Sequence, residues 1–306
     1  MKHQRIAFGL MLAFFLLAPL VLYPVFLMKV MCFALFACAF NLLVGFGGLL
    51  SFGHAMFLGT AGYAAAHSAK MWGFPPEAAI LFGTFAAALL GLVSGLLAIR
   101  RQGIYFAMIT LALAQMIYFF YLQAPFTQGE DGIQSVPRGR LLGFIDLTGI
   151  WAMYGTVLVV FTAGFLVIFR TIHSPFGQVL KAIRENEPRA ISLGYDTTRY
   201  KFLAYLLSAT LAGLAGATKA IVFQLASLTD AHWSMSGEVV LITLLGGMGT
   251  VFGPVAGALV VISMENYLAQ FGAWVTIAQG VIFVICVLTF RRGIVGEIAH
   301  FIKKPL

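Results

Sequence analysis

The chain has 306 residues, of which 61% are hydrophobic and only 10% are charged, and its formal net charge is +8. A soluble globular domain carries roughly 25% charged residues, so this composition lacks the material for a water-facing shell. The positive charge does not indicate nucleic-acid binding, because the basic residues lie in short gaps between apolar runs, as membrane topology signals do. We therefore predict an all-α integral membrane protein whose single transmembrane domain covers residues 1–306.

Apolar runs between polar breaks predict a polytopic bundle of about ten transmembrane segments, because one span needs about 20 apolar residues. The first run exceeds the apolar core of a signal peptide, about 7–15 residues, and has no A-x-A-like cleavage site, so we expect a retained helix. The pair of segments that meets at Thr250 could also be a re-entrant element. The predicted segments are 6–27, 30–47, 52–68, 78–99, 103–122, 151–169, 202–222, 236–250, 251–269 and 272–290.

The positions of the basic residues predict the orientation. Most of the 19 Lys and Arg residues fall near the N-terminus, at 100–101, in the gap 170–201 or after position 290. The alternate gaps, including the long connection 123–150, contain few of them. Because cytoplasmic loops carry the excess of Lys and Arg, we predict that both termini and the 170–201 loop are cytoplasmic. The 123–150 connection is then an outer loop.

The 170–201 loop contains two predicted short helices. Ser174 can cap a helix with Pro175 at its first position, and Glu187-Pro188 ends it, because the residue before proline disfavours helical geometry. A second helix can then run to Gly194. Apolar residues at i, i+3, i+4 and i+7 form one stripe along the first helix. They are Phe176, Val179, Leu180 and Ile183.

Two interpretations of these helices are possible. They could lie on lipid headgroups, or they could dock into a cytoplasmic partner and transmit its motion. The charges are mixed (Arg184, Glu185, Glu187 and Arg189), which favours a protein partner over an anionic lipid surface. The chain contains no nucleotide-binding loop of the G-x-x-x-x-G-K-[ST] kind, so ATP, if transport uses it, must bind to another polypeptide.

Two glycine-rich stretches, 45–54 and 246–254, interrupt membrane-length apolar sequence. Glycine-interrupted segments in the two halves of a transporter indicate its pathway, because irregular backbone at membrane depth is tolerated only beside protein or a water-filled cavity. The alternative is that they are tight turns in which glycine serves packing alone. The candidate residues of the translocation path are Asn41, Gly45, Gly47, Gly48, Ser51, Gly53, His54, Gly246, Gly247, Gly249, Thr250 and Gly253.

Ionisable residues inside predicted spans are costly and are often functional. His54 could line the path or could be a hydrogen-bonded structural residue, and we expect Glu238 and Glu265 near helix ends. We identify no nucleophile–base set and no metal-ligand cluster, and so predict neither catalysis nor a metal site. Small buried roles are expected for Cys32, Cys38 and Cys286. Small residues at four-residue spacing predict helix contacts; they are Gly91 and Gly95, then Ala209, Gly213 and Ala217, then Gly253 and Gly257.

Three motifs carry a family resemblance. The stretch 41–55, Asn-Leu-Leu-Val-Gly-Phe-Gly-Gly-Leu-Leu-Ser-Phe-Gly-His-Ala, resembles the N-terminal signature of branched-chain amino-acid ABC permeases of the LivM type. The 174–196 loop resembles their ATPase-coupling segment, and 245–254 resembles their C-terminal glycine motif. The residues that would couple to the ATPase are Phe176, Lys181, Ile183, Arg184, Glu185, Asn186, Glu187 and Arg189.

The resemblance implies a multi-pass subunit of the bacterial inner membrane that works by alternating access. Its partners would be a second permease, two cytoplasmic ATPase subunits that bind the ATP, and a periplasmic substrate-binding protein that meets the 123–150 loop. The second permease could be a paralogue or a second copy of this chain, and no cofactor is expected on this chain itself. The alternatives are an ABC permease for urea or short-chain amides, an ion-gradient-driven secondary transporter, and an intramembrane enzyme.

Overall fold

The computed structural model describes residues 2–268 and 293–302, together with positions 277, 280, 281, 283–285 and 288. The predicted segment 272–290 therefore lies mostly outside the described residues, as do Cys286, Arg291, Arg292, Lys303 and Lys304. What is described is mostly helical, which confirms the all-α prediction, and the strands are only two residues long.

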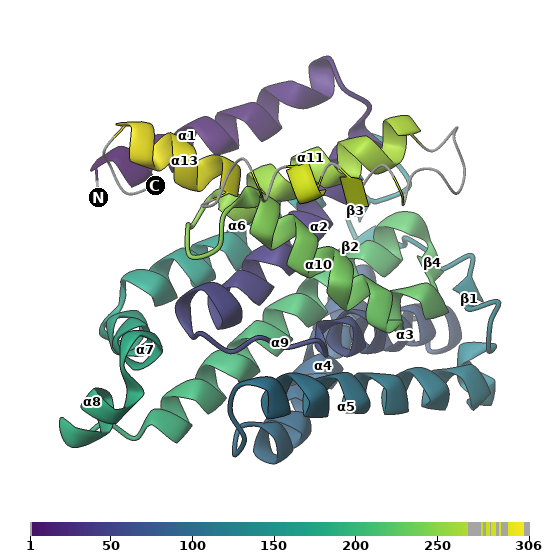
Figure 1. Ribbon diagram of the computed structural model, residues 1–306. Helices are drawn as coiled ribbons and strands as arrows, with labels where there is room; N and C mark the ends of the chain where they lie inside the picture. Colours follow the sequence, from purple (N-terminus) through teal and green to yellow (C-terminus); the bar gives the residue numbers. More distant parts are fainter. Residues whose placement is uncertain are drawn as a thin grey trace.

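The helices follow the chain as shown in Figure 1. They are α1 (Lys2–Leu17), α2 (Pro24–Asn41), α3 (His54–Met71), α4 (Pro76–Ala98), α5 (Ile104–Gln123), α6 (Ile150–His173), α7 (Pro175–Glu185), α8 (Glu187–Ser192), α9 (Thr197–Phe223), α10 (Trp233–Gly246), α11 (Gly253–Leu268) and α13 (Gly293–Ile302). The short elements are the 3₁₀ turns η1 (Ala18–Leu20), η3 (Pro125–Thr127) and η4 (Leu228–Ala231), a π-helical turn η2 (Leu42–Phe46), and the strands β1 (Ile133–Gln134), β2 (Arg140–Leu141), β3 (Ile145–Asp146) and β4 (Leu225–Ala226).

Among the described residues, five helices are long and apolar enough to cross a membrane. They are Pro24–Phe46, Pro76–Ala98, Ile104–Gln123, Ile150–His173 and Thr197–Phe223. The apolar helices Ile6–Leu20 and Trp233–Gly246 are shorter than the roughly 20 residues of a full span. The chain is therefore a multi-pass α-helical membrane protein, and the number ten stays a prediction.

One predicted segment is wrong in its extent. The apolar run 6–27 is not a single helix, because α1 ends at Leu17 and α2 begins at Pro24. Pro19 lies at the start of the intervening turn η1, and Pro24 is the first residue of α2. Proline has no N–H and is favoured at first helical positions, so two prolines five residues apart divide the run.

Helix α2 is the centre of the bundle, and most of its side chains are buried. Helices α3, α4 and α9 pack together beside it, and small residues bring α4 and α9 close. A Cβ on Gly91 would lie 2.6 Å from that of Ala209, and one on Gly213 would meet Ala87. The predicted helix contacts at Gly91, Ala209 and Gly213 are thereby confirmed, as is the burial of Cys32 and Cys38.

The two long connections lie at opposite ends of the molecule, with α7 and α8 at one end and the strands at the other (Figure 1). In the 123–150 connection, β1 pairs antiparallel with β4, and Arg138 Nη2 donates to Val222 O at 2.8 Å. This connection is thus bound to the segment that follows α9. Strands β2 and β3 form a hairpin whose tip exposes Phe144 to 92%.

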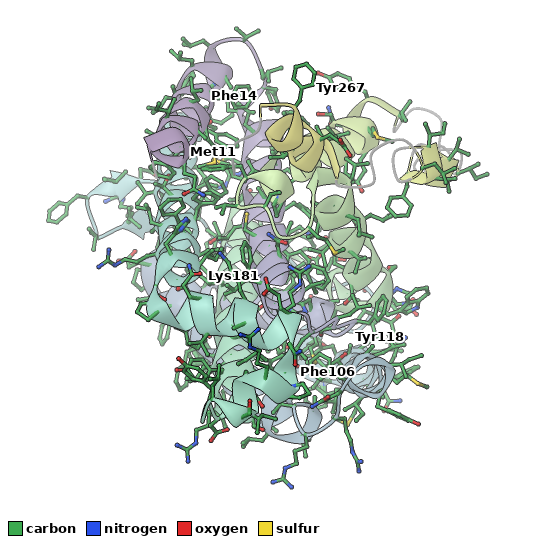
Figure 2. All side chains as sticks on the ribbon, turned by 60° about the vertical axis from the view of Figure 1, so that its left-hand side comes forward. Met11, Phe14, Phe106, Tyr118, Lys181 and Tyr267 are labelled. Carbon is green, nitrogen blue, oxygen red and sulfur yellow. The ribbon has the colours of Figure 1, made fainter. Side chains whose placement is uncertain are left out.

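An apolar cavity of about 420 Å³ lies between α1 and α11. Met11 and Phe14 of α1, labelled in Figure 2, line it with Phe252 and Val255 of the α11 side. Exposed apolar side chains on α1 and α4 agree with a lipid-facing surface.

Candidate functional site

The two glycine-rich stretches meet in space, and the side chain of Asn41 joins them. Asn41 Nδ2 donates to Thr250 O at 2.8 Å, and Asn41 Oδ1 accepts from Gly249 N at 3.0 Å. Asn41 is 2% exposed, at the point where α2 gives way to the π-helical turn. One buried amide therefore satisfies two backbone groups of a segment more than 200 residues away, which non-helical backbone in a membrane protein requires.

Close backbone approach explains glycine at this meeting point, which we call the junction. A Cβ on Gly45 would lie 2.7 Å from Gly249 N and would collide with the Asn41 amide oxygen. Gly249 also has a φ of +77°, a backbone conformation that residues other than glycine rarely adopt. These positions therefore admit no larger residue without displacement of the backbone.

Helix α7 reaches the junction directly. Its start is as predicted, with Ser174 Oγ accepting from Gly177 N and Pro175 as the first helical residue. The predicted apolar stripe faces inward, because Leu180 and Ile183 are at most 2% exposed. On the same helix, Arg184 Nη1 donates to Gly45 O.

Two further contacts hold α7 against the glycine stretch. The Arg184 stem lies against Gly48, whose φ is +70°, and the Lys181 ammonium lies 5.4 Å from the centre of the Phe46 ring. Figure 2 shows Lys181 on the α7 ribbon. The first short helix of the loop is therefore bonded to the end of the π-helical turn.

The other predicted coupling residues divide into two groups. Asn186 caps α8, with Oδ1 accepting from Arg189 N at 3.0 Å, and Glu187 forms an ion pair with Lys201 at 2.5 Å. Phe176 stacks on Tyr200 with ring centres 5.4 Å apart. Glu185 and Arg189 are exposed, and their side chains form no ion pair or hydrogen bond within the described part of the chain.

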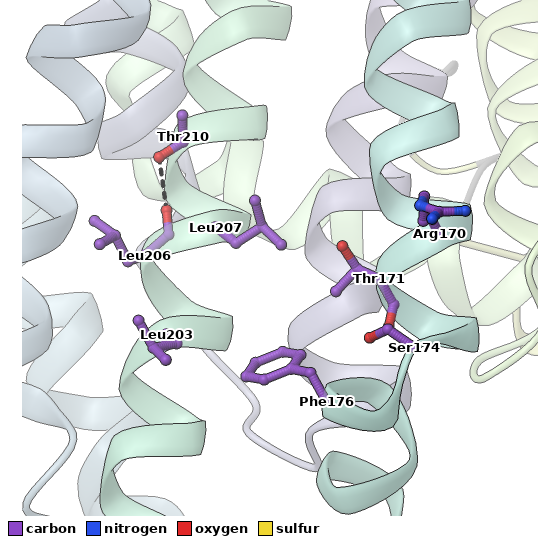
Figure 3. Close-up of a pocket in the computed structure, with 8 residues that line it drawn as sticks. All are labelled: Arg170, Thr171, Ser174, Phe176, Leu203, Leu206, Leu207 and Thr210. Atoms are coloured by element: carbon purple, nitrogen blue, oxygen red, sulfur yellow. Dashed lines mark hydrogen bonds between the residues drawn. The ribbon is translucent and has the colours of Figure 1, made fainter.

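A cavity of about 500 Å³ lies between α6, α7 and α9 (Figure 3). Phe176 and Thr171 face Leu203 and Leu207 across it. The cavity is open toward the surface, so it is a groove between these helices and not a void in the packed interior.

His54 begins α3 and is completely buried. Its Nε2 lies 2.8 Å from Ser208 Oγ, and that hydroxyl donates to Ala39 O at 2.6 Å. Since the hydroxyl has one proton, His54 Nε2 must be the donor in the first contact. Nδ1 has no partner among the described atoms, and the rings of Phe40 and Phe57 meet the imidazole edge to face. This geometry is that of a hydrogen-bonded structural histidine.

The remaining candidate residues of the translocation path lie within the two glycine-rich stretches. Ser51 is buried, and its hydroxyl accepts from Gly53 N at 3.2 Å. In the second stretch, Thr250 Oγ1 donates to Gly247 O at 2.7 Å and accepts from Gly253 N at 3.1 Å. Gly47 and Gly246 each lie against backbone carbonyls, those of Leu43 and Gly253 respectively. Both stretches therefore lie between helices and are closed by local hydrogen bonds.

A second group of polar residues was not predicted as a unit. Lys29 Nζ donates to Glu265 Oε2 at 3.0 Å, and Lys219 forms an ion pair with Asp230. The sequence shows each of these residues near a helix end, but no local spacing reveals a pairing across 236 positions. Among the described residues, no group of three His, Cys, Asp or Glu side chains could hold a metal ion.

The fold and the two functional regions define a class: a polytopic α-helical membrane protein whose two interrupted regions meet at one end, beside a pair of short amphipathic helices. The family model for the permease component of branched-chain amino acid transport systems matches residues 24–289. The chain therefore belongs to this permease family.

Individual relatives agree with this assignment. The chain is 25% identical to the high-affinity branched-chain amino acid transport system permease protein LivM of Salmonella typhimurium and to that of Escherichia coli K12. In each case the match covers 86% of this chain and 68% of the relative. It is also 28% identical to the ribose import permease protein RbsC of Bacillus subtilis, over 72% of this chain and 70% of the relative. No solved structure matches it significantly.

Proposed function

We propose that this chain is the permease subunit of an ABC importer for branched-chain amino acids and that it works by alternating access. The observation that carries the proposal is the Arg184 contact with Gly45 O, because it bonds an amphipathic surface helix to the junction of both interrupted regions. A force on α7 is thereby delivered to the backbone between α2 and α3 and, through Asn41, to the turn between α10 and α11.

The same geometry and the family support the partners that we propose. Two cytoplasmic ATPase subunits would meet α7 and α8 at the exposed side chains of Glu185 and Arg189. A periplasmic binding protein would meet the opposite end, where the 123–150 connection presents the β2–β3 hairpin. A second permease completes the complex. In this arrangement the termini are cytoplasmic and the bilayer is the bacterial inner membrane.

The substrate assignment rests on the relatives named LivM, and the ribose import permease among the relatives is a reason to test it directly. We would reconstitute the chain with its second permease and its ATPases in proteoliposomes. We would then measure the uptake of radiolabelled leucine, urea, acetamide and ribose, each with its loaded binding protein. ATP-dependent uptake of leucine that is unaffected by ionophores is the expected result. Uptake driven by an ion gradient without ATP would contradict the proposal, and uptake of urea or acetamide in place of leucine would reassign the substrate.

The docking surface is tested separately. A pull-down of the chain should recover the ATPase subunits, and a Glu185→Ala, Arg189→Ala variant should recover much less. The matched control is Glu130→Ala, because Glu130 is equally exposed but lies in the 123–150 connection at the opposite end. A stable chain that recovers no ATPase in any form would contradict the importer assignment.

A further inference from the structure

Five charged residues gather at the end of the bundle opposite α7, and we call them the outer charge cluster. Lys29 and Lys219 come from α2 and α9, Asp230 from η4, and Glu238 and Glu265 from α10 and α11. The pairs Lys29–Glu265 and Lys219–Asp230 are described above. Charged side chains among apolar helices are expensive, so a set drawn from five elements needs a reason beyond packing.

Phe33 joins the two ion pairs. The Lys29 and Lys219 ammonium groups lie 5.7 Å and 5.3 Å from the centre of its ring. Phe33 itself is 4% exposed. The two cations are therefore held at fixed places beside one aromatic ring, where their attraction to its face adds to the two ion pairs.

Glu238 is the member whose bonding is incomplete. Its carboxyl group contacts that of Glu265 and lies in the field of both lysines. The atom Oε1 is buried and has no hydrogen-bond partner among the described residues. Two carboxyl groups in contact repel each other when both are ionised, and a buried acceptor without a donor is costly. An incoming ammonium group would reduce the repulsion between the two carboxyl groups and would donate a hydrogen bond to Oε1.

The two lysines supply hydrogen-bond donors, and their side chains are partly exposed. Each ammonium group has three N–H donors. Within the described part of the chain, each lysine uses one of them in a hydrogen bond to a carboxylate. The side chains of the Lys29–Glu265 pair are 34% and 23% exposed, and those of the Lys219–Asp230 pair are 16% and 12% exposed. Donors for a carboxylate and an acceptor for an ammonium therefore lie together in one partly open place.

We propose that the outer charge cluster binds the charged ends of a zwitterionic α-amino acid during its transport. Glu238 accepts from the substrate ammonium, and Lys29 and Lys219 donate to its carboxylate. This site deepens the proposed function and rests on it. A neutral substrate such as urea or ribose would have no use for a paired arrangement of three carboxyl and two ammonium groups.

The cluster is connected to the junction by the helices that carry it. Lys29 precedes Asn41 on α2, about 18 Å away along the helix axis. Glu238 and Glu265 lie on α10 and α11, the helices on either side of the turn that Asn41 holds. A movement of the junction therefore displaces three of the five charged residues, which would release the substrate when the ATPases act.

The test compares the reconstituted importer with a Glu238→Gln variant, which keeps the size of the side chain and removes its carboxyl group. With saturating leucine-loaded binding protein, the maximal uptake rate should fall about tenfold or more, the effect expected when one charge-assisted hydrogen bond is lost. The KM for the loaded binding protein and the ATPase rate without it should stay unchanged. Tyr23→Phe, a change in an exposed side chain directly before α2, should match the wild type.

A charge-swapped variant, Lys29→Glu with Glu265→Lys, separates substrate binding from a purely structural ion pair. The swap keeps the pair but exchanges the signs, so the assembled importer should hydrolyse ATP and fail to transport leucine. If Glu238→Gln does not assemble, the double variant Lys29→Met, Glu265→Gln replaces it, because it leaves no unpaired charge of that pair.

Other outcomes would overturn the site. An unchanged maximal rate in Glu238→Gln, or wild-type transport by the charge swap, would show that the cluster is structural. A change confined to the KM for the loaded binding protein would assign it to docking of that protein. Absence of amino-acid uptake by the wild type, with uptake of a neutral substrate in its place, would instead overturn the proposed function and this site with it.

Discussion

The amide nitrogen of Asn41 donates to the carbonyl oxygen of Thr250 at 2.8 Å, across 209 positions of the sequence. The same side chain accepts from the N–H of the preceding residue, Gly249. Two interrupted regions from opposite parts of the chain are thus joined by one buried residue. Together with the Arg184 contact on Gly45 O, this bond makes the junction a single connected unit that is hydrogen-bonded to α7.

Replacement of Asn41 by alanine should destabilise the protein by about 2 kcal/mol or more, because it leaves the Thr250 carbonyl and the Gly249 N–H buried without partners. The measurement is thermal unfolding of the purified chain in detergent. The matched control is Asn186→Ala, which removes an exposed helix cap and should cost about 1 kcal/mol. Equal losses in the two variants would contradict the bridging role of Asn41.

Substitution of Gly45 by alanine should abolish transport, because its Cβ would collide with the Asn41 amide oxygen and approach Gly249 N to 2.7 Å. The comparison is Gly155→Ala on α6, where a Cβ meets nothing within 4 Å. That variant should be as active as the wild type and, since alanine favours a helix by about 1 kcal/mol over glycine, no less stable. Uptake and membrane abundance are measured for both variants. An active Gly45→Ala protein would show that the two interrupted regions can move apart at the junction without loss of transport.

Much of this architecture can be predicted from the sequence, because its signals are local. The density of glycine locates the two interrupted regions, and Ser174-Pro175 predicts the first residue of α7 correctly. Long-range pairing cannot be predicted in this way. The apolar stripe indicates which face of α7 is buried, but Arg184 lies off that stripe, and only the fold shows that it reaches Gly45 O.

The same limit explains why the outer charge cluster cannot be predicted from the sequence. Lys29 and Lys219 mark helix ends in the sequence and serve as topology signals, and Glu238 and Glu265 are single acids in apolar runs. Their association depends on the packing of four helices, which no spacing within one helix encodes. The run 6–27 shows the opposite failure, since its hydrophobicity conceals a break that Pro19 and Pro24 impose.

The ion pair between Glu187 and Lys201 should hold α8 to the start of α9. The side chains are only 20% and 7% exposed, so removal of one partner leaves a poorly solvated charge and should cost about 3 kcal/mol. Glu187→Ala should therefore lower the unfolding temperature far more than Glu185→Ala, whose carboxylate is exposed. In a double-mutant cycle, Glu187→Gln with Lys201→Met should recover much of the loss, and additive losses would contradict the pairing.

Arg184→Lys should uncouple ATP hydrolysis from transport without preventing assembly. Lysine keeps the charge but lacks the planar fork of donors that lets Arg184 reach the Gly45 carbonyl while its stem lies against Gly48. The junction would then no longer follow α7. In proteoliposomes we expect ATPase activity within about twofold of the wild type and uptake reduced about tenfold or more, which corresponds to about 1.4 kcal/mol or more in the coupled step.

The comparison is Arg189→Lys on α8, whose side chain forms no hydrogen bond or ion pair within the described residues. It faces outward, so a change there should affect recovery of the ATPase subunits and leave the ratio of uptake to ATP hydrolysis unchanged. In the proposed function Arg189 binds the ATPase and Arg184 passes its motion inward, so the two variants test these two roles separately. Equal loss of assembly in both variants would place Arg184 on the docking surface and would remove the direct connection from α7 to the junction.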